Sequence, residues 1–397
     1  MGILWGWLYP IARFWTLVVD QYIYLNNKNQ LLSLIKQWLK LDIIAVDTEF
    51  ERSRTYFPVL SLVQIYDGKQ AYLIDLLGED APIAELKQII TNKHLIKVIH
   101  SAEEDIAALY HRLNAAPENV IDSQIAADMA GLGSDLAYIK LVSQLESTEL
   151  SKSETRTDWL QRPLTQAQLS YAAEDVIYLF PLYHKLCTML KAQGRYPWLL
   201  EESEHRRQKI IAHYHEDGSN YFYRIAGASK LNGTQQQILM RLCLWREKEA
   251  RARNVPRQHL FRDKLLLSIA EQQTTHPQLS PRLNNVYVQE RLKKYQPQLN
   301  TCLLEGEDLN QNIPLMFKPV LNRTQAKGLK QLIAYRNQKA EQLGIGSNLL
   351  LSKRKLTEVI RVHYGLSTKD YGELITGWRA EILLPGLIEQ LDLLEIV

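Results

Sequence analysis

Residues 43–50, IIAVDTEF, place two carboxylates inside an otherwise apolar run. The run is rich in β-branched residues, which predicts a strand. Side chains at positions i and i+2 of a strand point to the same face, so Asp47 and Glu49 are expected to converge. Two neighbouring anions repel each other unless a cation joins them, and carboxylate oxygens suit a divalent metal ion. An isolated D-x-E pair is also typical of a strand whose polar face meets solvent, so both interpretations stay open at this point.

Short apolar runs on both sides of this segment predict the rest of a sheet. Residues 60–66 and 70–75 are joined through Asp67-Gly68, which is a strong hairpin signal. Helical patterns at 29–39, 83–90 and 102–113 alternate with apolar runs at 95–99 and 120–121. A three-strand meander followed by alternating helices and strands predicts an α/β domain in which helices cover a mixed sheet. We place this domain at residues 21–205.

Two further acidic clusters lie in the same domain. Glu103-Glu104-Asp105 opens a helix, where the helix dipole favours acids whether or not they bind a ligand. The spacing leaves open which of the three points inward, although Asp105 borders the predicted buried face. In a helix predicted over 165–190, Tyr171 and Asp175 are four residues apart and therefore share a face. A structural tyrosine beside a solvent-facing aspartate is the alternative.

The region after residue 205 differs in charge and in pattern. Residues 1–204 hold 18 Lys and Arg against 26 Asp and Glu, a net charge of −8, whereas the remainder carries +11. Metal-binding carboxylates in one region and phosphate-binding cations in another would produce this asymmetry, although chance drift of charge would also do so. The basic positions that stand out are Arg241, Arg246, Lys248, Arg251, Arg253 and Arg257, followed by Lys353, Arg354 and Lys355. Solvated helix faces are the plainer interpretation for any one of them.

A repeat organises this basic region. Shifting residues 231–250 by 90 positions lays them over 321–340 with 8 identities in 20, among them Arg246 over Arg336. The helical patterning of both copies predicts two all-α modules, which we place at residues 215–295 and 315–397.

Residues 1–20 form an apolar, aromatic-rich segment interrupted by Arg13. A signal peptide would begin with a basic region, and a membrane-spanning helix would need about 20 apolar residues. We therefore expect an N-terminal extension of unassigned role and no stable membrane anchor. The three cysteines, Cys187, Cys243 and Cys302, lie far apart without zinc or disulfide spacing. This cysteine usage favours a cytoplasmic protein.

The order of the three acidic clusters, D-x-E, D and Y-x-x-x-D, resembles the tyrosine-containing branch of the DEDD exonuclease superfamily. The segments DTEFERSRTYFPVLSLVQI, HSAEEDIAAL, SETRTDWLQRPL and YAAEDVIYLFPLY are similar to the ribonuclease D family. The repeat resembles that family's two helicase-and-RNase-D C-terminal modules, most visibly in LCLWREKEARARN and LIAYRNQKAEQLG. The resemblance runs from about residue 20 to the C-terminus with every motif position intact. It implies an α/β ribonuclease-H-like exonuclease domain followed by two all-α helical domains.

The resemblance also implies the site and its chemistry. Two divalent ions, Mg²⁺ or Mn²⁺, would be held by Asp47, Glu49, Asp105 and Asp175. Tyrosine has an ordinary pKa near 10 and is a poor proton acceptor at neutral pH, so we expect Tyr171 to orient the attacking water.

The implied activity is 3′–5′ exoribonuclease cleavage that releases nucleoside 5′-monophosphates, with tRNA precursors as substrates. The chain holds no P-loop, no G-x-S-x-G elbow and no G-x-G-x-x-G fingerprint, so we expect no small-molecule cofactor. We also expect a monomer. Two alternatives remain. A DNA 3′–5′ exonuclease fits because the metal site does not read the sugar, and a non-catalytic nucleic-acid-binding scaffold fits the basic repeats.

Overall fold

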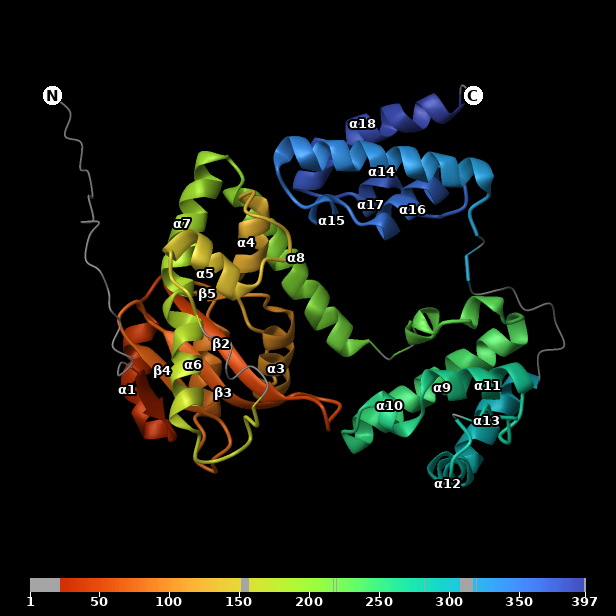
Figure 1. Ribbon diagram of the computed structural model, residues 1–397, viewed down its shortest axis with the longest axis horizontal. Helices are drawn as coiled ribbons and strands as arrows, with labels where there is room; N and C mark the ends of the chain where they lie inside the picture. Colours follow the sequence, from red (N-terminus) through yellow and green to blue (C-terminus); the bar gives the residue numbers. More distant parts are fainter. Residues whose placement is uncertain are drawn as a thin grey trace.

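The computed structural model describes residues 22–150, 157–216, 218, 220–281, 283–307, 317–318 and 320–395. The predicted N-terminal extension, residues 1–20, lies outside the described residues. In the described ranges a lobe with a sheet leads through one long helix to two helical lobes, which lie one above the other on the right of Figure 1. None of the helices in these ranges combines the length and the apolar character that crossing a bilayer requires.

One six-stranded sheet forms the centre of the N-terminal domain, in the order β1-β4-β3-β2-β5-β6. The strands are β1 (Tyr22–Leu25), β2 (Ile43–Glu51), β3 (Val59–Tyr66), β4 (Ala71–Asp75), β5 (Ile96–Ile99) and β6 (Val120–Asp122). β2, β3 and β4 form the predicted antiparallel meander, whereas β1, β5 and β6 pair in parallel with β4, β2 and β5. The mixed sheet is therefore confirmed, and β1 is an addition that the sequence patterns did not predict.

Helices cover both faces of the sheet because successive strand residues point to opposite sides. Ile44 and Val46 face α1 (Lys28–Trp38), α2 (Ile83–Ile90) and α3 (Glu103–Leu113) in one buried cluster. Ala45, between them, belongs to the opposite cluster, which includes residues of α4 (Ser123–Met129), α5 (Tyr138–Glu146), α6 (Gln166–Ile177) and α7 (Leu179–Ala192). The single helix predicted over 165–190 is thus divided near Tyr178. Pro181 explains the break, because it has no N–H to donate to the carbonyl of Ile177.

The helix α8 (Tyr196–His215) leads out of the N-terminal domain toward the helical region. The short helices η1 (Tyr221–Arg224) and η2 (Ala228–Lys230) follow it. The first helical module consists of α9 (Gly233–Arg253), α10 (Arg257–Leu260), α11 (Asp263–Gln272), α12 (Val286–Lys294) and α13 (Gln296–Glu307). The second consists of α14 (Arg323–Leu343), α15 (Ser347–Leu350), α16 (Lys353–His363), α17 (Tyr371–Leu374) and α18 (Trp378–Glu395).

The structure confirms the 90-residue repeat. Helices α9 and α14 begin and end 90 residues apart, and so do α10 and α15. Asn232 and Asn322 cap the N-termini of α9 and α14 with the same capping box. Arg246 and Arg336 are both buried, and each donates a hydrogen bond to a backbone carbonyl 15 residues later, at 2.6 and 2.8 Å. The identities of the repeat therefore mark the scaffold of the module.

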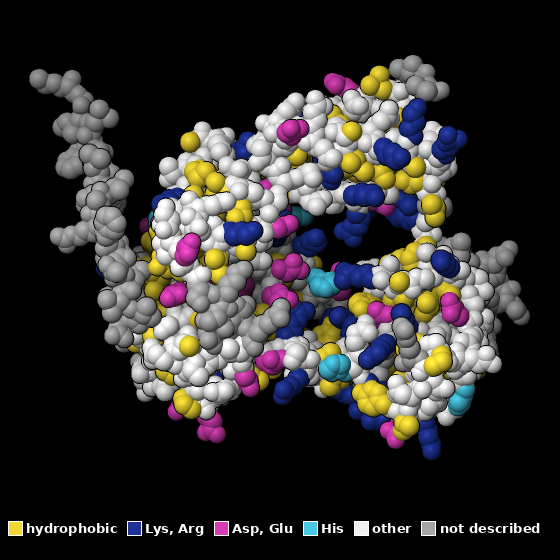
Figure 2. All heavy atoms as spheres, in the orientation of Figure 1, with side chains coloured by type: hydrophobic (Ala, Val, Ile, Leu, Met, Phe, Trp, Pro, Cys, Tyr) yellow, Lys and Arg dark blue, Asp and Glu magenta, His cyan; other side chains and the backbone are white. Residues whose placement is uncertain are grey.

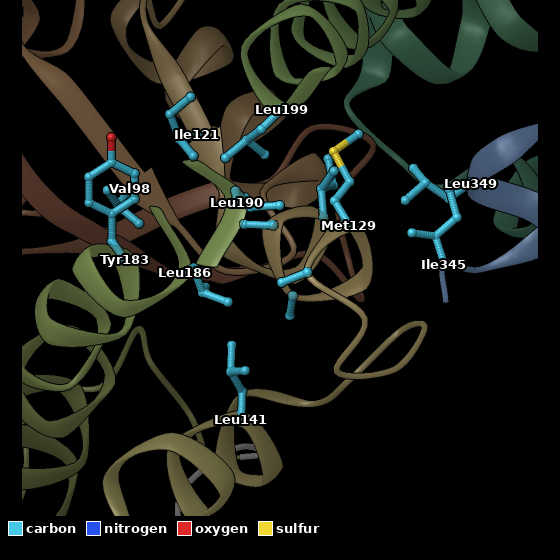
Figure 3. Close-up of a cluster of buried hydrophobic side chains, with 14 of the residues drawn as sticks. Val98, Ile121, Met129, Leu141, Tyr183, Leu186, Leu190, Leu199, Ile345 and Leu349 are labelled. Carbon is cyan, nitrogen blue, oxygen red and sulfur yellow. The ribbon is translucent and has the colours of Figure 1, made fainter. Parts of the chain in front are cut away.

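The two modules meet the N-terminal domain differently. Residues of the second module share a buried cluster with that domain, and Figure 3 shows Ile345 and Leu349 opposite Met129. The Arg195 guanidinium donates to the Leu343 carbonyl at 2.7 Å beside this cluster. The first module has an apolar core of its own, against which Tyr56 from the β2–β3 loop packs.

Candidate metal centre and active site

Three carboxylates meet beside the central strand of the sheet. Asp47 and Glu49 lie on β2, and Asp175 lies on α6, which packs on β2. One carboxylate oxygen from each residue can be chosen so that the three lie within 4.8 Å of one another. The i, i+2 spacing on the strand brings Asp47 and Glu49 to the same face, as the sequence predicts. The spacing alone could not supply the third partner, because α6 is more than 100 residues away along the chain.

Asp105 lies at the first turn of α3, close to this group. Among the three acids that open the helix, Asp105 is buried while Glu103 and Glu104 are exposed. Its carboxylate accepts a hydrogen bond at 2.5 Å from the hydroxyl of Thr48, the β2 residue that separates the two strand acids in the sequence. Asp105 is outside the three-residue group, but its negative charge raises the pKa of both Asp47 and Glu49. The four carboxylates therefore belong to one electrostatic unit.

The four carboxylates are buried, repel one another and have no cationic partner to balance their charge. Burial, followed by the charges of Asp105 and Asp175, raises the pKa of Asp47 well above its ordinary value. The same causes, with burial the largest, raise the pKa of Glu49 to about 9. Burial is also the main reason that the pKa of Asp105 and that of Asp175 each rise to about 7. No Lys or Arg within the described ranges forms an ion pair with any of the four. An all-oxygen donor set with unbalanced negative charge fits a hard divalent cation.

Tyr171 lies one turn before Asp175 on α6, as the spacing predicts. A hydrogen bond between the two side chains lowers the pKa of Asp175, although burial outweighs this effect. The ring of Tyr171 also lies beside that of Trp159, with centroids 6.2 Å apart. The phenol is therefore held at the carboxylate group.

Tyr138, at the start of α5, is a neighbour of the site that the sequence analysis missed. Its hydroxyl donates to the backbone carbonyl of Glu174 at 3.1 Å, next to Asp175. Burial, followed by the charges of Asp175 and Asp47, raises the pKa of Tyr138 well above 10. A lone tyrosine between an alanine and an isoleucine gives no sequence signal, because only the fold brings α5 over α6.

The basic positions singled out in the first helical module are mostly engaged inside the protein. Arg246 is buried and pairs with Asp263 at 2.8 Å, while Arg251 and Arg257 both pair with the buried Glu247. Arg253 pairs with Glu249. The expectation that these arginines form a phosphate-binding patch is therefore wrong for the buried members, because their charge is already compensated. In the second module, Lys353, Arg354 and Lys355 have no such ion pair among the described residues.

The fold and the carboxylate geometry define a class of protein that comparison with known families identifies directly. Residues 22–191 match the family model described as 3′-5′ exonuclease. Residues 235–278 match the HRDC domain, and residues 323–387 match the C-terminal HRDC domain of ribonuclease D. The chain is therefore an exonuclease with two HRDC modules.

Full-length relatives narrow this class. The chain is 33% identical to ribonuclease D of Shewanella sp. strain ANA-3 over 384 residues, covering 97% of each chain. It is 32% identical to ribonuclease D of Escherichia coli K12 over 379 residues, covering 92% of this chain and 97% of the relative. The chain belongs to the ribonuclease D family of 3′–5′ exoribonucleases. Its substrate class is RNA, and the acidic group at Asp47, Glu49 and Asp175 fits the divalent metal that exonucleases of this family use.

Solved structures agree with this assignment. The crystal structure of Escherichia coli RNase D, described as an exoribonuclease involved in structured RNA processing, superposes with a TM-score of 0.81 at 29% identity. The match covers 94% of this chain and 98% of that one. The catalytic core of RRP6 from Trypanosoma brucei has a TM-score of 0.55 at 22% identity, over 72% of this chain and 81% of that one, and shares the fold.

Proposed function

We propose that the chain removes nucleoside 5′-monophosphates one at a time from the 3′ ends of structured RNAs, with tRNA precursors as its cellular substrates. The observation that carries the proposal is the convergence of Asp47, Glu49 and Asp175, with Asp105 behind them, in an exonuclease fold. The description of the Escherichia coli relative as an enzyme of structured RNA processing supports the substrate class.

Two divalent cations, Mg²⁺ or Mn²⁺, complete the site in this proposal. Four negative charges balance two such ions, and the residues that would hold them are Asp47, Glu49, Asp105 and Asp175. When bound, the ions supply a lowered water pKa and charge stabilisation at the phosphate. The hydrogen bond from Thr48 fixes the orientation of the Asp105 carboxylate in advance.

The other residues of the site position the reactants. Tyr171 is a poor base, so its hydroxyl orients the attacking water by hydrogen bonding rather than by taking a proton. Tyr138 holds the Glu174 carbonyl and thereby the part of α6 that carries Asp175. The reaction is fast only when the reacting groups are held in the correct geometry, which these two tyrosines help to maintain.

The domain boundaries proposed from the sequence are 21–205, 215–295 and 315–397, and the matched segments at 22–191, 235–278 and 323–387 support them. We further propose a monomer without a small-molecule cofactor. All three cysteines are buried and no disulfide bond joins any two of them, which supports a reducing, cytoplasmic location.

A ladder assay tests the reaction. The purified protein is incubated with 5′-labelled RNA or the matching DNA in Mg²⁺ or Mn²⁺, with EDTA as a control and Asp47→Ala as the site variant. Stepwise shortening of RNA from its 3′ end, much faster than that of DNA and lost with EDTA or the variant, is expected. Glu103→Gln is the matched control, because this neighbouring acid is exposed and should retain activity.

The same assay separates the alternatives. Equal shortening of DNA would identify an exonuclease that ignores the 2′-hydroxyl. Salt-sensitive RNA binding without any shortening would identify a binding scaffold. A tRNA precursor with a short 3′ trailer, compared with the same RNA lacking the trailer, tests the cellular substrate: trimming should stop close to the end of the stem.

A further inference from the structure

A second group of charges lies between α8 and the second helical module, away from the carboxylate site. Lys209 comes from α8, Arg354 and Lys355 come from α16, and Arg379 comes from α18. We call these four residues the α8–α16 cluster. Arg379 links the two elements, because its guanidinium pairs with Glu202 of α8 at 2.6 Å and donates to the carbonyl of Leu350, three residues before α16, at 3.0 Å. The charges of Arg379, Lys209 and Arg354 add to the effect of burial in lowering the pKa of Lys355. Figure 2 shows Lys and Arg side chains gathered around the hollow between the lobes.

The α8–α16 cluster carries more positive charge than the protein itself balances. Glu202 is the acid that faces it, and this carboxylate pairs with Arg206 at 2.9 Å and with Arg379 at 2.6 Å. Within the part of the chain that the structure describes, neither Lys209, Arg354 nor Lys355 has a carboxylate at ion-pair distance. Three cations therefore have no acidic partner, so an anion that reaches them gains attraction without displacing an ion pair.

The position of the cations on α16 adds to this imbalance. Lys353, Arg354 and Lys355 occupy the first turn of the helix, directly after the N-cap Ser352. The helix dipole favours anions at this end, so three cations there weaken the isolated helix. An external phosphate would interact favourably with both the side chains and the dipole.

The repeat provides an internal comparison. Ninety residues earlier, the same three positions of the first module hold Asp263, Lys264 and Leu265. Asp263 pairs with the buried Arg246, and Leu265 is buried in the module core. The first module thus has an acid and a core residue where the second has Lys353 and Lys355, so the HRDC scaffold does not require these two cations in order to fold.

The large aromatic ring beside the cluster, that of Trp378, is not available to stack on a base, which leaves the smaller imidazole of the exposed His205 on α8. Trp378 is 2% exposed, stacks on Trp198 at 4.9 Å and is covered by the Arg379 guanidinium at 4.4 Å. Single-strand sites typically combine cations with free aromatic faces. Cations without a large free aromatic face favour contact with backbone phosphates, which a duplex presents at high density.

We propose that the α8–α16 cluster binds backbone phosphates in the base-paired part of an RNA whose single-stranded 3′ end occupies the carboxylate site. This inference rests on the proposed function, since it assigns the cluster to the same substrate. The cluster joins the helix that leaves the exonuclease domain to the second HRDC module. RNA bound there spans two lobes, so the stem is held while the tail is shortened.

The test uses the double variant Lys209→Gln/Lys355→Gln in the full-length protein. Two RNAs with the same 3′ tail are compared, a hairpin and a short single strand. The KM for the hairpin should rise about tenfold, and the slope of log affinity against log salt should fall by about two, one unit per lost phosphate contact. The kcat on both RNAs and the KM for the single strand should stay unchanged. Lys327→Gln/Lys330→Gln, two exposed lysines on α14, is the charge-matched control.

Two results would overturn the inference. One is an unchanged hairpin KM, and the other is an equal rise for both RNAs, which would reflect a general loss of positive charge. Direct titration of the hairpin in EDTA measures binding without turnover. If the wild-type protein shortened neither RNA, the proposed function would fail, while the titration of the double variant would still decide this inference.

Discussion

The chain buries carboxylates in two places, and the two are electrostatically opposite. At the active site, burial and mutual repulsion raise the pKa of Asp47, and no cationic side chain of the described protein compensates it. Glu247 in the first HRDC module is also buried, and burial would raise its pKa, but hydrogen bonds from Arg257, Tyr56 and Arg251 outweigh this effect and lower it. The pKa is raised where the carboxylates lack a cationic partner and lowered where arginines already compensate the charge. We call Asp47, Glu49, Asp105 and Asp175 the uncompensated group, and Glu247 with Tyr56, Arg251 and Arg257 the compensated group.

The compensated group also lies where the first module contacts the exonuclease domain. Tyr56, on the β2–β3 loop, donates to Glu247, and the Phe57 amide donates to the Asn254 side chain at 3.0 Å. This contact is polar, whereas the second module meets the same domain through a shared apolar cluster. The two HRDC modules therefore contact the exonuclease domain through different kinds of interaction.

The largest effect is expected from changing a carboxylate of the uncompensated group. Asp47→Asn should lower single-turnover cleavage at least about 10³-fold, which corresponds to about 4 kcal/mol of lost transition-state stabilisation. The metal-free variant should also be more stable than the wild type at neutral pH, because the wild type must bury a carboxyl that has no cationic partner and whose pKa is well above its ordinary value. Thermal unfolding in EDTA measures the second effect, and a variant less stable than the wild type would show that the charges are balanced after all.

Removing the acid of the compensated group should have the opposite consequence for stability. Glu247→Ala leaves Arg251 and Arg257 without their partner, and breaking such a buried group costs about 3 kcal/mol or more. Chemical denaturation of the full chain measures the loss. Glu249→Ala, which breaks the more exposed pair with Arg253, should cost no more than about 1 kcal/mol. Equal losses in the two variants would contradict the comparison.

Metal ions should affect stability in a pH-dependent way. The pKa of Asp105 and of Asp175 is raised to about 7 in the folded protein, against about 4 when unfolded. The folded state then binds more protons, so metal-free stability falls as the pH rises from about 4 through 7. Mn²⁺ or Mg²⁺ should raise the Tm by a few degrees at pH 8 and by much less at pH 5, where protons occupy the site. An equal rise at both pH values would argue against binding at these carboxylates.

The smallest effect is expected at the edge of the compensated group. Tyr56→Phe removes one hydroxyl that donates to Glu247 and should cost about 1 kcal/mol. The two arginines still compensate the carboxylate, so the pKa of Glu247 should stay below its ordinary value. Denaturation curves compared with those of Glu247→Ala test the order of the two effects, and a larger loss for Tyr56→Phe would reverse it.

Periodicity and repetition explain what the sequence could predict. The alternation along residues 43–50 places Asp47 and Glu49 on one face, and the 90-residue identity locates the two modules, because both depend on local pattern. The choice of Asp105 among three neighbouring acids came from the family resemblance, and its burial agrees with that choice.

Contacts between distant segments explain what the sequence could not predict. The four-residue spacing of Glu247 and Arg251 already permits their ion pair on one helix face, but Tyr56, which is 191 residues from Glu247, joins this group only in the fold. The parallel pairing of β1 with β4 depends in the same way on a distant partner. No local pattern carries such information, because these pairings form only when the whole domain is assembled.

The apolar cluster that the second module shares with the exonuclease domain has a consequence for synthesis. Asp128, beside this cluster, accepts a hydrogen bond from the backbone amide of Gly346, which the ribosome adds 218 residues after Asp128. At about 5–20 residues per second, a ribosome adds that length in roughly 10–40 s. During that interval the exonuclease domain exposes an apolar surface that only the last module covers. A nascent chain stopped before α14 should therefore depend on chaperones and be cut by proteases more readily than the finished enzyme.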